Sequence, residues 1–202
     1  MKKVIDCFKK DNPLIQKKLK EVSVEEGMVI AKELFEILNK RKDGIGLAAN
    51  QVGIDAQVAV VNVREPLVFI NPQLINKSNE INYYEGCLSF PKKGCHTKRY
   101  ETIEVTTAQK EGSLLFSGVK INGQDDHQLR TLEAVCVQHE IDHLNGMRIL
   151  DRVYSTTYVR DFEKIGRNKL VTIKKGDVVK ILKYKKTKKF LDQGWTIQVG
   201  DK

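Results

Sequence analysis

Two histidines and a glutamate stand close together in the run Gln138-His139-Glu140-Ile141-Asp142-His143. Residues four apart share one face of a helix, so His139 and His143 can both direct a ring nitrogen at one ion. Glu140 can reach a metal-bound water, as the general base does in the H-E-x-x-H pattern. The competing interpretation is an amphipathic helix whose histidines are satisfied in the core. This helix is apolar on most sides and expected to be buried, and two buried histidines beside a buried glutamate favour an ion.

A metal site of this kind needs a third protein ligand. Downstream of His143 there is no further histidine or cysteine, and Asp151 and Glu163 do not fit the spacings of zincin-type peptidases. Cys136 shares the helical face, but a rise of about 1.5 Å per residue separates it from His143 by roughly 10 Å, too far for one ion. The other upstream candidates are Cys87, Cys95, His96 and His127.

Cys87 follows a glycine in the segment Glu85-Gly86-Cys87-Leu88-Ser89, and a glycine suits a backbone that must approach another group closely. Another segment, Gly44-Ile45-Gly46-Leu47-Ala48-Ala49-Asn50-Gln51, precedes it. Together with the run from Gln138 to Leu144, these segments resemble the three signatures of the peptide deformylases, in the same order. The resemblance covers roughly residues 1–151 and does not extend to the tail.

The resemblance implies an α+β fold, in which antiparallel sheets pack around a central buried metal-binding helix and an N-terminal helix precedes them. We expect residues 1–151 to form the catalytic domain. Residues 152–202 are expected to form a small, basic and β-rich C-terminal extension.

The family's chemistry implies a metal-dependent hydrolase with a fourth coordination position for water. The implied protein ligands are Cys87, His139 and His143. Glu140 would take a proton from the metal-bound water as it attacks a carbonyl, and then pass it to the leaving amine. The side-chain amide of Gln51 and the backbone N–H of Leu88 would stabilise the developing oxyanion. The resemblance implies iron(II) as the metal, and zinc, nickel or cobalt can replace it because a thiolate with two imidazoles accepts them all.

The implied substrate is the N-formyl group of formyl-methionine on nascent polypeptides. The backbone of Ile45, Gly46 and Gly86 would hold the peptide as an added strand. The methionine pocket is expected to be lined by Ile45, Leu132, Val135, Cys136 and the His139 ring. The stretch Pro91-Lys92-Lys93-Gly94 lacks the arginine with which some bacterial members contact the peptide, so recognition beyond methionine is expected to be looser.

Glu85 is expected to pair with Arg99 and brace the Cys87 segment; the alternative is a surface pair worth under ~1 kcal/mol. For Asp142 two interpretations remain open, a solvated charge on the helix and a supporting contact to the site. Cys95 is interpreted as an incidental thiol.

Local patterns predict several elements. Ser23 and Glu26 form a capping box for a helix that runs to about Arg41. Glycines and a proline are expected to break up the stretch from Gly86 to Gly94. Strands are predicted at 58–63 and 67–70, and an antiparallel pair of strands at 102–106 and 113–116. The metal helix is predicted at 129–145. A brief helix near 155–166 is expected to be followed by two or three short strands.

Composition limits the function classes. Gly44 and Gly46 follow a helix instead of opening one, which excludes a dinucleotide-binding loop. No apolar stretch approaches the ~20 residues of a membrane span. The N-terminus lacks the pattern of a signal or transit peptide. Four irregularly spaced cysteines, one assigned to metal as a thiolate, indicate a reducing compartment, so we expect a cytoplasmic enzyme.

The positive charge is concentrated in the tail. Residues 152–202 hold 14 Lys and Arg against 5 Asp and Glu, whereas residues 1–151 hold 21 of each. The tail is either a solvated β appendage or a segment that docks on ribosomal RNA. Two alternatives to a deformylase are a general metallopeptidase, disfavoured by the Cys87 ligand, and a basic RNA-binding module with a structural metal.

Overall fold

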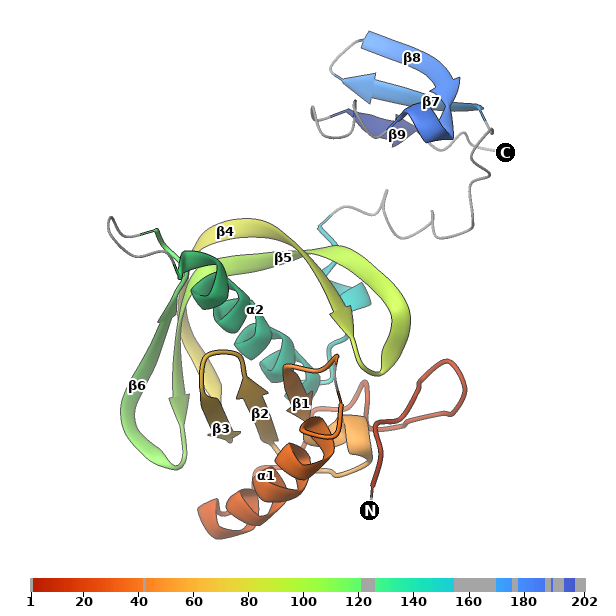
Figure 1. Ribbon diagram of the computed structural model, residues 1–202. Coiled ribbons are helices and arrows are strands. Elements are labelled where there is room, and N and C mark those ends of the chain that lie inside the picture. Colours follow the sequence, from red (N-terminus) through yellow and green to blue (C-terminus); the bar gives the residue numbers. More distant parts are fainter. Residues whose placement is uncertain are drawn as a thin grey trace. The chain divides into compact units, whose positions relative to one another are not determined.

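The computed structural model describes residues 2–41, 43–120, 126–154, 170–175, 178–187, 190 and 195–198. The chain divides into two compact units, residues 1–154 and 155–202. The boundary expected from the sequence, between 151 and 152, lies slightly earlier. The larger unit combines helices with antiparallel sheets, so the α+β class is confirmed (Figure 1).

Helix α1 (Val24–Leu38) begins at the predicted cap, where the Glu26 backbone N–H donates to Ser23 Oγ at 3.2 Å. It ends at Leu38, before the predicted end at about Arg41. The reason is that the chain tightens into a turn in which the Arg41 N–H donates to the Leu38 carbonyl.

The first sheet has the antiparallel order β1-β2-β3. Its strands are β1 (Gly46–Ala48), β2 (Val58–Asn62) and β3 (Pro66–Ile70), and the short helix η1 (Ala49–Val52) follows β1. The two predicted strands are confirmed to within one residue at each end. The stretch Val58–Val61 is fully buried and β2 contacts both α1 and α2, so each face of this strand is covered.

A long hairpin dominates the second sheet. Its strands are β4 (Gln73–Cys87), β5 (Phe90–Thr107) and β6 (Lys110–Ser117), in the order β4-β5-β6. The predicted antiparallel pair is confirmed, because Thr102 lies opposite Ser117 and Thr106 lies opposite Ser113.

The prediction that the stretch from Gly86 to Gly94 is broken up is confirmed only in part, because β4 ends at Cys87 and a turn follows at residues 88–89, but β5 already begins at Phe90. Gly86 pairs with Gly94 and Cys87 pairs with Phe90, so the stretch forms the tip of the β4–β5 hairpin. Residues 91–93 are extra residues between these two pairs, and a proline is tolerated in such a bulge because it needs no ladder hydrogen bond there. The hairpin tip thereby brings Cys87 to the end of a strand.

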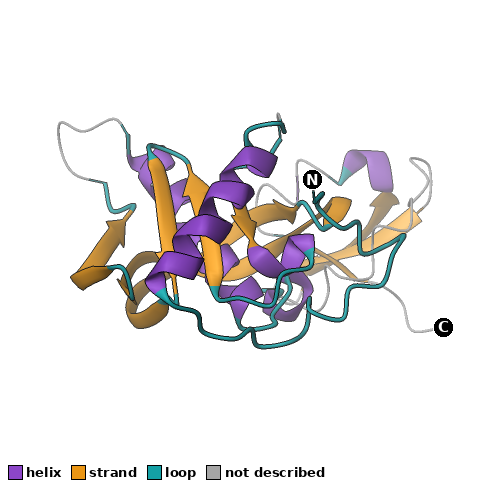
Figure 2. Cartoon of the chain, turned by 90° about the horizontal axis from the view of Figure 1, so that it is seen from below, coloured by secondary structure: helices purple, strands orange, loops and turns teal. Residues whose placement is uncertain are grey.

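Helix α2 (His127–Leu144) lies at the centre of the larger unit and contacts the strands of both sheets (Figure 1). Seen from below, α1 lies in front of the strands that it contacts (Figure 2). All residues from 133 to 144 are buried, as the apolar sequence predicted. The helix stops before Asn145 and Gly146, and Gly146 has a φ of 73°, which glycine adopts readily. No helix within the described ranges combines the length and apolarity that a membrane crossing requires.

The smaller unit contains an antiparallel sheet of order β8-β7-β9. Its elements are β7 (Leu170–Lys175), β8 (Val178–Lys183), η4 (Tyr184–Lys186) and β9 (Thr196–Gln198). Ile173 is completely buried, and Lys180 Nζ lies 4.9 Å from the centre of the Trp195 ring. The β-rich tail is confirmed, whereas the helix expected near 155–166 lies outside the described residues.

Candidate active site

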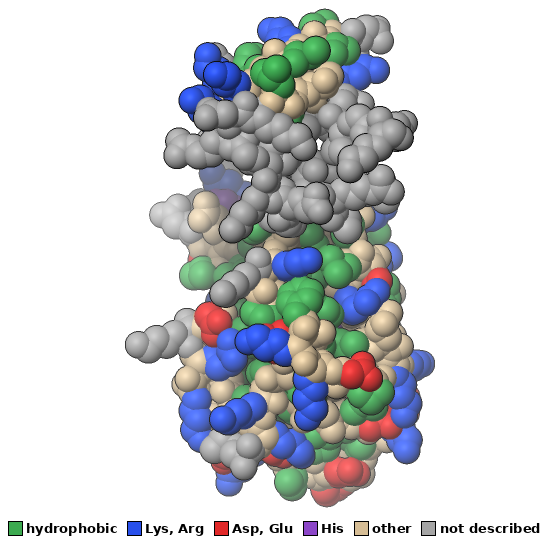
Figure 3. Space-filling model, turned by 90° about the vertical axis from the view of Figure 1, so that its right-hand side faces the viewer, with side chains coloured by type: hydrophobic (Ala, Val, Ile, Leu, Met, Phe, Trp, Pro, Cys, Tyr) green, Lys and Arg blue, Asp and Glu red, His purple; other side chains and the backbone are tan. Residues whose placement is uncertain are grey.

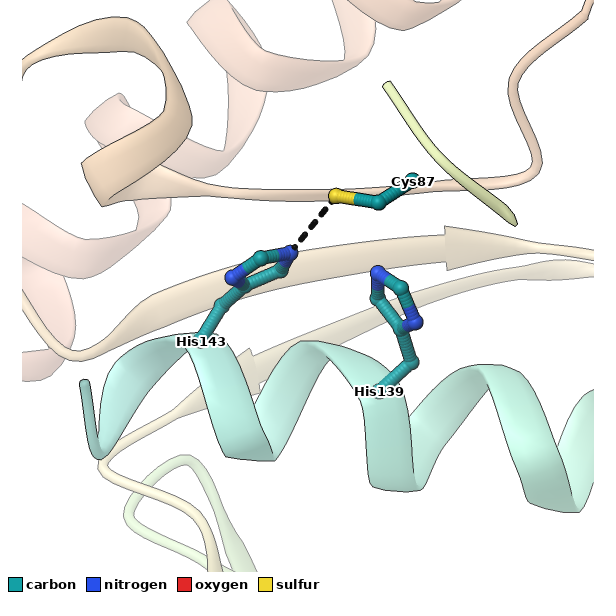
Figure 4. A group of neighbouring side chains, drawn as sticks. All are labelled: Cys87, His139 and His143. Carbon is teal, nitrogen blue, oxygen red and sulfur yellow. Dashed lines mark hydrogen bonds between the residues drawn. The ribbon is translucent and has the colours of Figure 1, made fainter. Parts of the chain in front are cut away.

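Three potential metal ligands meet where the β4–β5 hairpin passes over α2. His139 and His143 lie one helical turn apart, with ring centroids separated by 4.8 Å. Cys87, the last residue of β4, points its sulfur toward them, and Cys87 Sγ lies 3.2 Å from His143 Nε2 (Figure 4). One donor atom from each residue lies within 4.8 Å of the other two, and all three side chains are buried.

This donor set fits a divalent transition metal. Donor atoms at ~2.0–2.3 Å from a tetrahedral ion are about 3.3–3.8 Å apart, so only small side-chain shifts are needed. His139 Nδ1 lies 3.2 Å from Glu85 Oε2, which leaves Nε2 for an ion, as is usual for a metal-binding histidine. Burial, followed by the influence of His139, lowers the pKa of His143 well below its usual value, which keeps that imidazole neutral and able to bind metal.

Glu85 is held in its ionised form by two neighbours. Burial alone would raise the pKa of Glu85, but His139 and Arg99 outweigh this effect and lower the pKa to about 2. Arg99 Nη2 donates to Glu85 Oε1 at 2.6 Å, and the Arg99 side chain is only 2% exposed. The two residues expected to pair are therefore together in the core and not on the surface.

Asp142 extends this arrangement away from the metal site. Asp142 Oδ2 accepts from Arg99 Nη1 at 2.5 Å, and Asp142 Oδ1 accepts from Arg152 Nη2 at 2.7 Å. The interpretation of Asp142 as a solvated charge is wrong, because the residue is buried between two arginines. Arg152 comes from the short helix η2 (Ile149–Arg152) and has no sequence signal of its own.

Glu140 faces the cavity from the same helix. Its Oε2 has no hydrogen-bond partner among the described residues. Burial raises the pKa of Glu140 to about 7, and a carboxylate of this kind is suited to accepting a proton near neutral pH. A Cβ on Gly46 would lie 2.5 Å from Glu140 Oε1, so the glycine leaves the space that this carboxylate occupies.

Gln51 is buried and oriented by the chain around it. The Ala48 backbone N–H donates to Gln51 Oε1 at 2.8 Å, which turns the amide nitrogen toward Ser89 Oγ at 3.3 Å and Cys87 Sγ at 3.6 Å. Ser89 is a contact that the sequence reasoning did not single out, although it belongs to the second motif. Asn50, also within a motif, donates to the His143 carbonyl at 2.6 Å and so ties η1 to the end of α2.

A cavity of about 590 Å³ opens over these groups. Of the residues predicted for the site, those that line it are Ile45, Gly46, Gln51, Glu85, Gly86, Cys87, Leu88, Leu132, Val135, Cys136, His139 and Glu140. The sequence reasoning missed Arg41, Asp43, Tyr83, Tyr84 and Lys93 as lining residues. Tyr83 and Tyr84 directly precede the Cys87 motif on β4, and no pattern in the sequence marks them as lining residues.

The other candidate ligands lie elsewhere. The Cys95 thiol donates to the Ile149 carbonyl at 3.7 Å, and His96 Nδ1 lies 2.8 Å from Asn82 Oδ1. Cys136 lines the cavity, and His127 is the first residue of α2. Within the described part of the chain, only Cys87, His139 and His143 form a group able to hold a metal.

The site combines a neutral imidazole, a second imidazole bound by a carboxylate, and a thiol beside an open cavity. This arrangement defines a class of protein, the metallohydrolases that leave one coordination position of the metal free.

The family model for polypeptide deformylases matches residues 5–158. The peptide deformylase of Buchnera aphidicola is 33% identical over 171 residues, covering 80% of this chain and 91% of its own. That of Dictyoglomus thermophilum is 37% identical over 150 residues, covering 72% and 90%.

The crystal structure of peptide deformylase from Thermotoga maritima is similar as well, with a TM-score of 0.62 and 29% identity over 77% of this chain and 99% of that one. The chain belongs to the polypeptide deformylase family and is a metallohydrolase of that family.

Proposed function

We propose that this enzyme removes the N-formyl group from formyl-methionine at the start of nascent polypeptides and releases formate. The observation that carries the proposal is the buried group of Cys87, His139 and His143 at the cavity that Glu140 also lines, with a Glu140 oxygen that has no hydrogen-bond partner among the described residues. When bound by these three residues, a divalent metal supplies a Lewis acid that polarises the formyl carbonyl and acidifies water.

Glu140 is the proton carrier in this proposal. Its Oε2, which has no hydrogen-bond partner among the described residues, accepts a proton from the attacking water and delivers it to the amine that leaves. The low polarity around the carboxyl, which raises its pKa to about 7, makes both directions of transfer accessible near neutral pH.

Gln51 and Leu88 would stabilise the negative charge that develops on the formyl oxygen. The Gln51 amide nitrogen is already turned toward the site by the Ala48 N–H, so no reorganisation is needed during the reaction. Loss of one such donor typically lowers the rate ~100–1000-fold.

The substrate peptide would lie along the cavity between β1 and the end of β4. Ile45, Gly46 and Gly86 offer backbone groups there, and hydrogen bonds to the main chain tolerate many peptide sequences. Leu132, Val135 and Cys136 supply apolar lining for the methionine side chain.

Iron(II) is the metal we propose in the cell, with zinc, nickel or cobalt as replacements. The donor set accepts all four, so the ligands do not choose between them. A cytoplasmic location is proposed with it, since the Cys87 thiol must stay reduced to bind metal.

The direct test is formate release from a formyl-Met dipeptide by the wild type, Glu140→Ala and the control Glu36→Ala, an exposed position on α1. Loss of a general base predicts a fall of about 100-fold or more for Glu140→Ala and little change for the control. Equal rates for all three would exclude the proposed role of Glu140. Cleavage of unformylated peptides at internal bonds would instead favour a general metallopeptidase.

We further propose that the C-terminal unit docks on ribosomal RNA, where the substrates emerge. The register places Thr172 opposite Ile181 and Lys174 opposite Val179, so one face of the sheet carries Leu170, Val179, Ile181 and Lys183, all exposed. Figure 3 shows lysine side chains beside hydrophobic ones on this unit. Lysines contact phosphates, and this contact weakens with salt.

The docking proposal is tested by pelleting with ribosomes at several salt concentrations. Charge reversal of Lys183, Lys185 and Lys186 should weaken pelleting at low salt by about tenfold. Reversal of Lys10, Lys32 and Lys110, three exposed lysines of the larger unit, is the matched control. Equal weakening by both sets, or pelleting insensitive to salt, would count against docking by this unit.

A further inference from the structure

A second cavity, of about 330 Å³, opens on another face of α2. It is lined by Gln138, Ile141 and Asp142 of α2 and by Asn145, which directly follows the helix, and none of these lines the cavity of the active site. Its other walls come from β5, the start of β4 and the segment that precedes α1. All of these residues belong to the larger unit, and the site is independent of the proposed reaction.

Positive charge predominates in the wall of this second cavity. The cationic side chains are Lys18, Lys77, Lys98, Arg99 and Arg152, and the acidic ones are Glu21 and Asp142. A concave surface lined mainly by one sign of charge concentrates ligands of the opposite sign.

Three of the five cations are compensated by carboxylates. Asp142 pairs with Arg99 and Arg152, and Lys98 Nζ lies 2.5 Å from Glu80 Oε2.

Lys18 and Lys77 are in a different situation. Within the described part of the chain neither has an ion pair with a carboxylate, and Lys77 Nζ instead lies 4.6 Å from the centre of the Tyr100 ring. Glu21, in the same wall, is the one carboxylate there that likewise has no ion pair within the described part of the chain, so the groups without ion pairs leave an excess of positive charge for an external anion.

The cavity also has apolar surface. Ile141 is buried, and Leu74, Tyr100 and Met147 are partly buried along the same wall. An inorganic anion needs no such surface, and the volume lies at the lower end of the ~300–1,000 Å³ found for small-molecule pockets.

We propose that the second cavity binds a small organic phosphate, with Lys18 and Lys77 contacting the phosphate group and the apolar wall contacting the organic part. Lysine is a common phosphate ligand because its ammonium group is a compact charge with three donors.

The test is titration of the full chain with adenosine 5′-monophosphate, adenosine and inorganic phosphate, followed by backbone amide chemical shifts. Shifts are expected at residues 73–77 and 141–147, with the monophosphate binding at least about tenfold more tightly than adenosine. Tighter binding of the monophosphate than of phosphate would support a contribution from the apolar wall. Equal affinities for the monophosphate and for inorganic phosphate would overturn the proposal that the apolar wall contacts the organic part of the ligand.

Lys18→Gln with Lys77→Gln should weaken binding of the monophosphate about tenfold. Lys10→Gln with Lys110→Gln removes the same charge from exposed positions that line neither cavity, and is expected to change binding less than twofold. Equal effects of the two pairs, binding of adenosine as tight as that of the monophosphate, or no shifts at these residues would overturn the proposal. All four positions are exposed, so loss of the fold does not confuse the comparison.

Discussion

Arg99 and Asp142 form an ion pair in the core of the larger unit, with Arg99 Nη1 at 2.5 Å from Asp142 Oδ2. The remaining donors of the same guanidinium hold Glu85, which in turn holds His139. A chain of charged contacts therefore connects His139, a candidate metal ligand that lines the active-site cavity, with Asp142, which lines the second cavity.

Asp142→Asn should destabilise the protein strongly. The change leaves the buried Arg99 without one of its carboxylate partners, and breaking a buried pair costs about 3–5 kcal/mol. Urea unfolding at neutral pH measures the loss. Asp151→Asn, which breaks the partly exposed pair with Arg148, is the control and should cost about 1 kcal/mol or less. Similar losses of unfolding free energy for the two variants would mean that the buried Arg99–Asp142 pair stabilises the protein no more than an exposed pair does.

Glu85→Gln should weaken metal binding. The Glu85 carboxylate fixes the His139 ring so that Nε2 is available, and loss of such a contact typically lowers metal affinity 10–100-fold. Competition with a chelator for cobalt measures the affinity. Glu80→Gln is the control, because it breaks an exposed ion pair on the same strand and should leave the metal affinity unchanged. An unaltered affinity for Glu85→Gln would show that the contact does not position the ligand.

Cys87→Ser should remove the sulfur ligand. Cobalt-loaded wild type is expected to show a sulfur-to-metal charge-transfer band, which the variant should lack, and the variant should bind the metal more weakly because a thiolate suits these ions better than a hydroxyl. Cys95→Ser should keep the band, since Cys95 contacts the Ile149 carbonyl instead. Persistence of the band in Cys87→Ser would place the thiolate ligand elsewhere.

Glu140→Gln should stabilise the metal-free protein at alkaline pH. Burial raises the pKa of Glu140 from 4.5 to about 7, so the charged form is disfavoured in the folded state. The resulting cost is absent below the unfolded pKa, grows as the pH rises between the two values and is complete above the folded one. Thermal unfolding of both proteins should agree near pH 5, and near pH 8 the variant should be more stable by about 3 kcal/mol at most. A difference independent of pH would contradict the assigned burial effect.

Local patterns were sufficient for much of the fold. The cap at Ser23, the strands β2 and β3 and the stop at Gly146 each depend on a few neighbouring residues, so they could be predicted. The hairpin tip between Gly86 and Gly94 could not, because glycine and proline suggest an interruption until the partner strand is known. Strand pairing is a relation between residues distant in the chain, and it decided the position of Cys87.

By itself, the sequence determined that α2 would be buried and that His139, Glu140 and His143 would share one part of it, because helical periodicity acts over a single turn. The motif resemblance supplied Cys87 and Gln51 as partners. Only the tertiary structure decided that Arg99 would lie between Glu85 and Asp142, and that Arg152 would join them. A buried charge is stable only beside an opposite charge, and which residue supplies that charge depends on tertiary packing and not on spacing along the chain.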